Sequence, residues 1–262
     1  MNLKFYKYQG TGNDFVMLDN LDGGYDNLSL SDIQFLCDRK MGIGADGLIK
    51  LNAAPNVDFE VDYYNADGSK SFCGNGARCS IAFARHLGII ENRAKFLAID
   101  GMHQGTIEKE TVRLEMLPVK GIESIAHDYF VHTGSPHYVH LKKEGDADIV
   151  TYGKLIRYSD LFKEQGVNVN YFNELSSNKI AVETYERGVE DETLSCGTGV
   201  TGCALVYMEV NELNEGEIEV ETKGGKLSVS ATRKADGSFC DIWLSGPATC
   251  VFTGEIEDFS NV

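Results

Sequence analysis

A short cysteine motif occurs twice in this chain of 262 residues. Cys73 is followed by Gly-Asn-Gly, and Cys196, 123 positions later, by Gly-Thr-Gly. The residues after each motif are almost free of charge, and residues 200–208 carry none. A helix that is apolar on most sides is normally enclosed by the fold, so each motif predicts a buried helix beginning at its cysteine. Unpaired N–H groups at such a helix start favour an anion, which places both thiols in a positive potential.

Other features recur at nearly the same offset and in the same order. This regularity indicates two copies of one domain. The first helix of the first copy is expected to begin at Ser31, because Ser31 and Gln34 have the spacing of a capping box. The matched features are Gly12-Asn13 and Gly134-Ser135, helices at 31–37 and 159–165, turns at 42–44 and 166–168, alternating strands at 59–64 and 180–185, and three strands after each cysteine helix (96–99, 104–109 and 111–116; 218–222, 226–232 and 239–244).

The expected fold class is therefore α+β, with two pseudo-symmetric repeats. Each repeat is a mixed, strand-rich sheet curled around a central helix, and the active site is expected in the cleft between them. The N-terminal repeat domain should span 1–117 and the C-terminal repeat domain 118–250. The tail, 251–262, exceeds two full repeats, so we expect it to return to the first domain.

Composition excludes several classes of partner. A net charge of −16 argues against nucleic acid and anionic membrane surfaces. No apolar stretch reaches the roughly 18 residues of a membrane span, and residues 1–7 lack a signal-peptide core, so a cytoplasmic protein is expected. Seven cysteines, an odd number without a Cys-x-x-Cys pair, indicate reduced thiols rather than disulfides or structural zinc. Apart from Cys73 and Cys196 they are expected in the core.

Two symmetric cysteines suggest a pair of acid–base groups rather than one nucleophile. Inverting a carbon that carries hydrogen requires a thiolate on one face and a thiol on the other. A helix dipole worth up to about 2 kcal/mol lowers a thiol pKa by roughly 1.5 units, from about 8.5 to near neutrality. Glycine N–H groups beside the thiols, at Gly74, Gly76, Gly197 and Gly199, are suited to grip a substrate carboxylate.

Six motifs spread along the whole chain resemble those of diaminopimelate epimerase. They lie at 10–15, 42–46, 65–68, 73–79, 186–188 and 196–199. The resemblance implies a cofactor-independent isomerase, without a metal, that interconverts LL- and meso-2,6-diaminopimelate for lysine and peptidoglycan synthesis. It also implies a homodimer.

The resemblance further implies the site residues. The catalytic positions match Cys73 and Cys196, with His137 assisting. Arg187 is suited to bind a distal carboxylate. Glu186 is suited to bind an ammonium group and is also expected among the catalytic residues. The substrate contacts match Asn13, Asn65, Gly74, Asn75, Asn168, Glu186, Arg187, Gly197 and Thr198.

Three positions depart from the family pattern. Ser135 stands where the family commonly has Asn, and Gly47 where it often has Gln; both remain expected substrate contacts. The segment 65–73 is one residue shorter than usual. These departures concern the distal pocket more than the chemistry.

Two other functions fit part of the pattern. A proline or hydroxyproline racemase shares paired cysteines, but a ring substrate has no second charged end for Asn168, Glu186 and Arg187. A redox-sensing thiol module would use the cysteines as a disulfide switch and would not require a distal charged pocket.

Overall fold

The computed structural model describes residues 2–259. Contacts between Cα atoms divide the chain into two compact units. Unit 1 comprises Met1–Leu114 together with Pro247–Val262, and unit 2 comprises Glu115–Gly246. Among the described residues, no helix is both long enough and apolar enough to cross a membrane.

Unit 1 is a mixed sheet with two helices. Its strands are hydrogen-bonded in the order β17-β1-β2-β3-β4-β5-β6-β7, with parallel pairs at β2–β3 and β4–β5 and antiparallel pairs elsewhere. The elements are β1 (Leu3–Gly10), β2 (Asn13–Asn20), α1 (Leu30–Cys37), β3 (Gly47–Asn52), β4 (Phe59–Asn65), α2 (Gly74–His86), β5 (Arg93–Ala98), β6 (Gly101–Glu108), β7 (Thr111–Glu115) and β17 (Thr249–Ile256).

Unit 2 repeats this topology. Its order is β8-β9-β10-β11-β12-β14-β15-β16, with parallel pairs at β10–β11 and β12–β14, and the short β13 lies beside β12. The elements are β8 (Glu123–Ile125), β9 (Asp128–His132), β10 (Pro136–Leu141), α3 (Ile149–Arg157), β11 (Asn168–Ser176), β12 (Lys179–Glu186), β13 (Asp191–Thr193), α4 (Gly197–Val210), β14 (Glu215–Thr222), β15 (Gly225–Arg233) and β16 (Phe239–Pro247). The α+β fold with two pseudo-symmetric repeats is thus confirmed.

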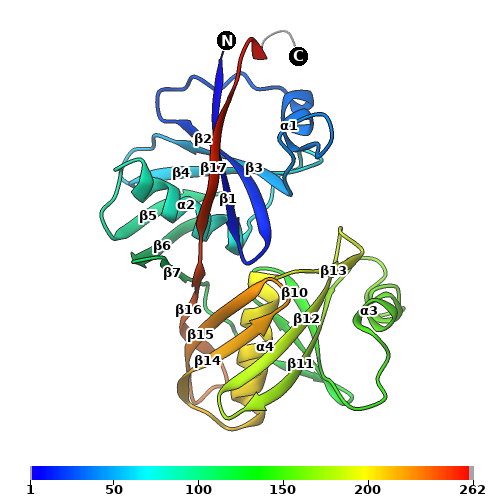
Figure 1. The fold of residues 1–262 in the computed structure, drawn as a ribbon. Helices are drawn as coiled ribbons and strands as arrows, with labels where there is room; N and C mark the ends of the chain where they lie inside the picture. Colours follow the sequence, from blue (N-terminus) through cyan, green and yellow to red (C-terminus); the bar gives the residue numbers. More distant parts are fainter. Residues whose placement is uncertain (1, 260–262) are drawn as a thin grey trace. The chain divides into compact units, whose positions relative to one another are not determined.

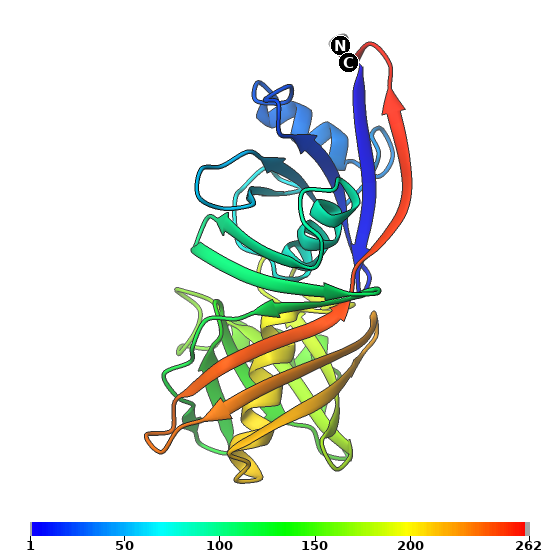
Figure 2. The same cartoon turned by 90° about the vertical axis from the view of Figure 1, so that its left-hand side faces the viewer.

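The two cysteine helices, α2 and α4, form the centres of their units. α2 contacts strands β1–β4 and β6, and α4 contacts β9–β12, β14 and β15; Figures 1 and 2 show α4 enclosed by strands. Every residue of 74–84 and of 199–208 is buried, as the scarcity of charge in both segments predicts. Both helices begin directly after their cysteines, which confirms the prediction for this element.

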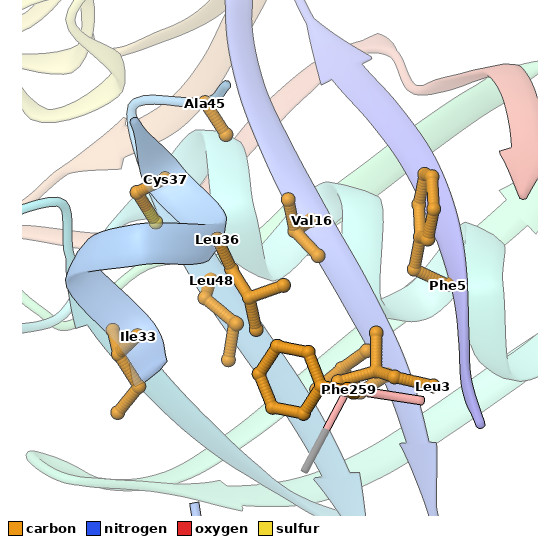
Figure 3. Close-up of a cluster of buried hydrophobic side chains, with 10 residues drawn as sticks. Leu3, Phe5, Val16, Ile33, Leu36, Cys37, Ala45, Leu48 and Phe259 are labelled. Atoms are coloured by element: carbon orange, nitrogen blue, oxygen red, sulfur yellow. The ribbon is translucent and has the colours of Figure 1, made fainter. Parts of the chain in front are cut away.

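A second apolar cluster of unit 1 lies between α1 and the sheet. Figure 3 shows Phe259, from the C-terminal segment, beside Leu3 of β1 and Leu36 of α1. β17 pairs along β1 (Figure 2), so the C-terminal segment contributes both an edge strand and core contacts to unit 1. The buried members are Leu3, Phe5, Val16, Leu18, Ile33, Leu36, Cys37, Ala45, Leu48 and Phe259.

Three local predictions were wrong. The capping box of α1 joins Ser29 and Asp32 rather than Ser31 and Gln34. The segment 159–165 forms turns; the helix of this region is α3, which starts earlier because the Asp148 carboxylate accepts from the N–H groups of Val150 and Thr151. Cys240 and Cys250 are partly exposed rather than buried.

Candidate functional site

Both cysteines occupy the N-cap positions of their helices. Their backbones are nearly identical, with φ −131° and ψ 115° at Cys73 and φ −119° and ψ 111° at Cys196. Both side chains are partly exposed. Cys73 Sγ accepts from the Gly76 N–H at 3.5 Å, so one free donor of the first turn is directed at sulfur. The local geometry therefore favours negative charge at Cys73, whereas Cys196 makes no side-chain cap hydrogen bond and is favoured as an anion only by the helix dipole.

Asn13 lies beside Cys73. Its Oδ1 lies 3.4 Å from Cys73 Sγ and 3.3 Å from Asn75 Nδ2. Its Nδ2 donates to Asp46 Oδ2 at 2.7 Å. A carboxylate only accepts hydrogen bonds, so Asp46 determines which end of the amide faces the thiol. Cys73 consequently faces a fixed acceptor, Asn13 Oδ1.

Asp46 is in turn held by an ion network. Arg39 donates to Asp14 at 3.1 and 2.7 Å and to Asp46 at 2.8 Å, and Lys7 pairs with Asp14 at 2.7 Å. Burial alone would raise the pKa of Asp14, but Arg39 and Lys7 outweigh it and lower the pKa to about 2. Asp14 is therefore charged at neutral pH, and the network of hydrogen bonds through Arg39 and Asp46 orients Asn13.

Arg78 lies on α2 with no solvent exposure. Its Nη2 donates to Thr11 Oγ1 at 3.3 Å, whereas Nε and Nη1 have no hydrogen-bond partner among the described residues. Burial lowers the pKa of this guanidinium. A buried arginine is commonly paired with a carboxylate. Within residues 2–259, Arg78 has no such ion pair.

Gly47 and Asn65 lie at neighbouring strand ends, paired in register on β3 and β4. A Cβ at Gly47 would approach the Tyr63 ring and the Tyr64 carbonyl to 2.5 Å, so Tyr63 occupies the space that a longer residue would need. Asn65 Oδ1 accepts from the Tyr63 hydroxyl at 2.8 Å, and its Nδ2 donates to Ser69 Oγ at 2.9 Å. Asn65 thus organises the turn after β4.

In unit 2, His137 lies directly under the start of α4. It is completely buried, with Nε2 2.9 Å from Thr198 Oγ1 and Nδ1 2.8 Å from Asn170 Oδ1. Thr198 Oγ1 lies 3.5 Å from Cys196 Sγ. Burial lowers the pKa of His137 to about 4, so the imidazole is neutral at physiological pH.

The predicted distal residues are assembled around Asn168, the first residue of β11. Its Oδ1 accepts from the Arg187 N–H at 2.9 Å, and its Nδ2 donates to the Pro136 carbonyl at 3.2 Å. The exposed Arg187 side chain donates from Nη1 to the Gln165 carbonyl at 2.8 Å, and Glu186 ends β12. Asn168 therefore joins the start of β10 to the turn that carries Glu186 and Arg187.

Within each unit, the predicted residues lie at matching places. In unit 1, Asn13, Gly47, Asn65, Gly74 and Asn75 lie at strand ends or at the start of α2, and Asn13 is in contact with Cys73. Ser135, His137, Asn168, Glu186, Arg187, Gly197 and Thr198 occupy the corresponding ends in unit 2.

Sequence reasoning missed the residues that orient this set. Asp14 and Asp46 stand inside recognised motifs, but nothing in the sequence pairs them with Arg39. Asn170 and Thr184 are polar residues at buried strand positions. A polar residue where the strand pattern predicts an apolar one was the sequence signal that could have identified them. No group of three or more His, Cys, Asp or Glu within residues 2–259 is placed to hold a metal ion.

Comparison with known proteins gives a consistent result along the whole chain. A family model described as diaminopimelate epimerase matches residues 5–119 and 129–250. A protein named diaminopimelate epimerase from Flavobacterium psychrophilum is 46% identical over 253 residues, covering 95% of this chain and 98% of that protein. A second, from Chlorobaculum tepidum, is 37% identical over 258 residues, covering 94% and 98%.

Solved structures share the fold at low identity. A Bacillus anthracis phenazine biosynthesis protein of the PhzF family superposes with a TM-score of 0.75 at 13% identity, covering 98% of this chain and 99% of that one. A hydroxyproline epimerase from Agrobacterium vitis gives a TM-score of 0.69 at 14% identity, covering 97% and 92%. The fold is therefore shared widely, and the sequence matches are what select among its members: this chain belongs to the diaminopimelate epimerase family.

Proposed function

We propose that the protein is an isomerase that interconverts LL- and meso-2,6-diaminopimelate without a cofactor, in the synthesis of lysine and of peptidoglycan precursors. The observation that carries the proposal is the pair of cysteines, Cys73 and Cys196, each capping the central helix of one of two topologically equivalent units. Family membership supplies the substrate, and the equivalent caps support a two-base reaction.

In this reaction the two thiols act on opposite faces of one α-carbon. A thiolate removes the α-proton, and the other cysteine, as a thiol, delivers a proton to the opposite face. Helix N-termini favour the thiolate form, which a cysteine otherwise adopts only slightly at neutral pH. His137 and Glu186 are proposed to assist, His137 through Thr198.

Binding is divided between the two ends of the substrate. The N–H groups of Gly74 and Gly197, at the helix starts, are suited to the carboxylate beside the reacting carbon. Arg187 is suited to the distal carboxylate and Glu186 to an ammonium group. The remaining proposed contacts are Asn13, Gly47, Asn65, Asn75, Ser135, Asn168 and Thr198.

Two of these contacts are restricted by their surroundings. Gly47, which has no side chain, offers only its backbone, and Tyr63 fills the space that a side chain there would need. The side chain of Asn65 is engaged in its own turn, and its backbone N–H and carbonyl bond Ser69 and Gly68 there, so a ligand would have to share these groups.

The test is hydrogen exchange at the α-carbon, followed by NMR in D₂O with reduced protein and no added cofactor. LL-diaminopimelate, L-proline and trans-4-hydroxy-L-proline are supplied separately. Exchange confined to diaminopimelate, with the meso isomer accumulating, supports the proposal. Exchange only with a proline would replace it by an imino-acid epimerase, and no exchange with any of the three would refute an epimerase.

Serine variants provide the matched control. Cys73→Ser and Cys196→Ser should each lose turnover while retaining substrate affinity by calorimetry. If the natural purpose of the thiols were a redox switch, the variants would instead lose an oxidised form and show no change in a substrate reaction.

We also propose a cytoplasmic homodimer whose repeat domains are 1–117 with 251–262, and 118–250. Free cysteines throughout the described chain and a thiol-dependent reaction support a reducing compartment. Light scattering of the purified protein tests the dimer.

A further inference from the structure

A chain of hydrogen-bonded side chains, buried from His137 onward, runs beneath the start of α4. It begins at Cys196 and passes through Thr198 (3.5 Å) and His137 (2.9 Å) to Asn170 (2.8 Å) and Thr184 (2.7 Å). His137 and Asn170 have no solvent exposure and Thr184 has 3%. Burying three polar side chains is costly unless each is hydrogen-bonded, and here each has a partner, so the three side chains form one connected network.

The fold itself does not require these polar residues. In unit 1 the equivalent position of α2 is Gly76, and a Cβ there would meet Ile49 Cδ1 at 3.0 Å and Phe15 Cε1 at 3.5 Å. At Gly199 of α4 the same Cβ would meet the Asn170 amide at 2.5 Å and the His137 ring at 3.3 Å. One unit thus supports its cysteine helix with apolar side chains and the other with a hydrogen-bonded chain.

The donors and acceptors of this chain have a direction. Asn170 Nδ2 donates to Thr184 Oγ1, which leaves Asn170 Oδ1 to accept from His137 Nδ1–H. A neutral imidazole has one N–H, so His137 Nε2 must accept, and it accepts from the Thr198 hydroxyl. That hydroxyl proton is then committed, and Thr198 Oγ1 can only accept from the Cys196 thiol.

The surroundings oppose a second proton on His137. The titratable groups that face it are His132 of β9, Arg187 after β12 and, through Thr198, Cys196. Burial is the main cause that lowers the pKa of His137, to about 4, and His132 and Arg187 lower it further, against the Asn170 hydrogen bond. The neutral imidazole required by the directed chain is therefore the stable form.

We propose that Asn170 and Thr184 are positioning residues that hold Cys196 as the thiol, and hence as the proton donor, in the resting protein. The inference deepens the proposed function and rests on it, since it assigns one of the two acid–base roles. In the step concerned, the Cys196 S–H bond breaks and a C–H bond forms at the α-carbon, leaving Cys196 a thiolate, while Cys73 retains the proton taken from the opposite face.

The first test reads the tautomer of His137 directly. Long-range ¹H–¹⁵N correlation spectra of ¹⁵N-histidine-labelled protein, assigned with His137→Asn, should show a protonated Nδ1 and an unprotonated Nε2 at pH 7. A protonated Nε2, alone or in an imidazolium, would overturn the inference. In Thr184→Val the Asn170 amide loses its acceptor and can turn, so both tautomers should appear, whereas Thr184→Ser should keep the wild-type spectrum.

The second test measures the acidity of the Cys196 thiol through its rate of alkylation by iodoacetamide against pH, in a Cys73→Ser background. Asn170→Asp, which attracts a second proton to His137, should raise the rate at pH 7 about tenfold by favouring the thiolate. Thr184→Val should raise it several-fold, and Thr184→Ser should not. Unchanged profiles in folded Asn170→Asp and Thr184→Val proteins would overturn the inference.

The matched control is Cys73 in a Cys196→Ser background, whose alkylation should not respond to Asn170→Asp or Thr184→Val. Both readouts need no substrate. A protein with these signatures but no exchange of diaminopimelate would refute the proposed function alone, and an active protein without them would refute only the positioning roles.

Discussion

Replacing Gly199 by alanine probes the buried chain in one step. The new methyl group would lie 2.5 Å from Asn170 Nδ2 and 3.3 Å from both His137 Cε1 and Thr184 Oγ1. Overpacking costs about 1–3 kcal/mol, and a lost buried hydrogen bond costs about as much again. Alanine regains only about 1 kcal/mol in helix propensity. We therefore expect Gly199→Ala to lower the free energy of unfolding of unit 2 by about 2–3 kcal/mol.

Gly76→Ala is the matched change in unit 1. Its methyl group would meet the flexible tip of Ile49 at 3.0 Å, and a small shift of that side chain relieves the contact. The expected change is within about 1 kcal/mol of zero, because helix propensity offsets the packing cost. Two substitutions that look identical in sequence should therefore differ in their effect on the free energy of unfolding.

Urea unfolding measures this difference. The single tryptophan of the chain, Trp243, lies on β16 and reports on unit 2 by fluorescence, while circular dichroism follows the whole chain. Equal losses for the two alanine variants would refute the claim that the side chains beneath Gly199 are tightly constrained. So would a Gly199→Ala protein of wild-type stability.

Three further predictions follow from unit 1. Asp46→Asn frees the Asn13 amide to turn and should lower kcat/KM about 10- to 100-fold with little change in stability, measured by steady-state kinetics and urea unfolding. Asp14 has a folded pKa of about 2 against 3.8, so it should contribute about 2 kcal/mol that is complete above about pH 4 and lost as the pH falls toward 2; acid titration of unfolding should show this loss, and Asp14→Asn should not. Arg78→Met should be neutral or stabilising by about 1 kcal/mol in urea, because the guanidinium is buried with one hydrogen bond, and a loss above about 2 kcal/mol would contradict this.

The sequence predicts the architecture well where the spacing of apolar residues and the positions of glycines indicate the same element. The cysteine helices are marked by runs with little or no charge, which are typical of an enclosed helix, and their start is marked by Cys-Gly. Strands such as β4 and β12 alternate clearly between buried and partly exposed residues. These signals are local, and they need no knowledge of partners far along the chain.

The failures come from extending the repeat beyond what local chemistry supports. The helix expected at 159–165 was placed by the offset, whereas Asp148 caps a helix that ends at Arg157. At α1 either Ser29 or Ser31 could be the N-cap residue, because each is followed three positions later by a side chain that can complete a capping box, Asp32 or Gln34. The N-cap is the serine that lies outside the first turn, which is Ser29. Offsets predict which elements exist, while caps decide where they begin.

The candidate site divides in the same way. The cysteines, and the asparagines of the motifs, are readable because glycine-rich turns surround them. The orientation of Asn13 is not readable, because it depends on Asp46, held in turn by Arg39 through hydrogen bonds between distant segments. Such pairings arise only when strand ends converge.

The duplicated topology makes the inner faces of the two units directly comparable, and that comparison carries chemical information. A reaction that proceeds in both directions still needs its two acid–base groups in opposite states at the start of each turnover. Cys73 Sγ faces the Asn13 amide oxygen but also accepts from the Gly76 N–H, so its thiol and its thiolate each have a partner, whereas Cys196 makes no such cap hydrogen bond. Cys196 is coupled through Thr198 to an imidazole that burial keeps neutral. The two cysteines have nearly identical backbones. The side chains packed beneath them differ, apolar under α2 and hydrogen-bonded under α4, and this difference is a physical means of giving two equivalent thiols unequal acidity.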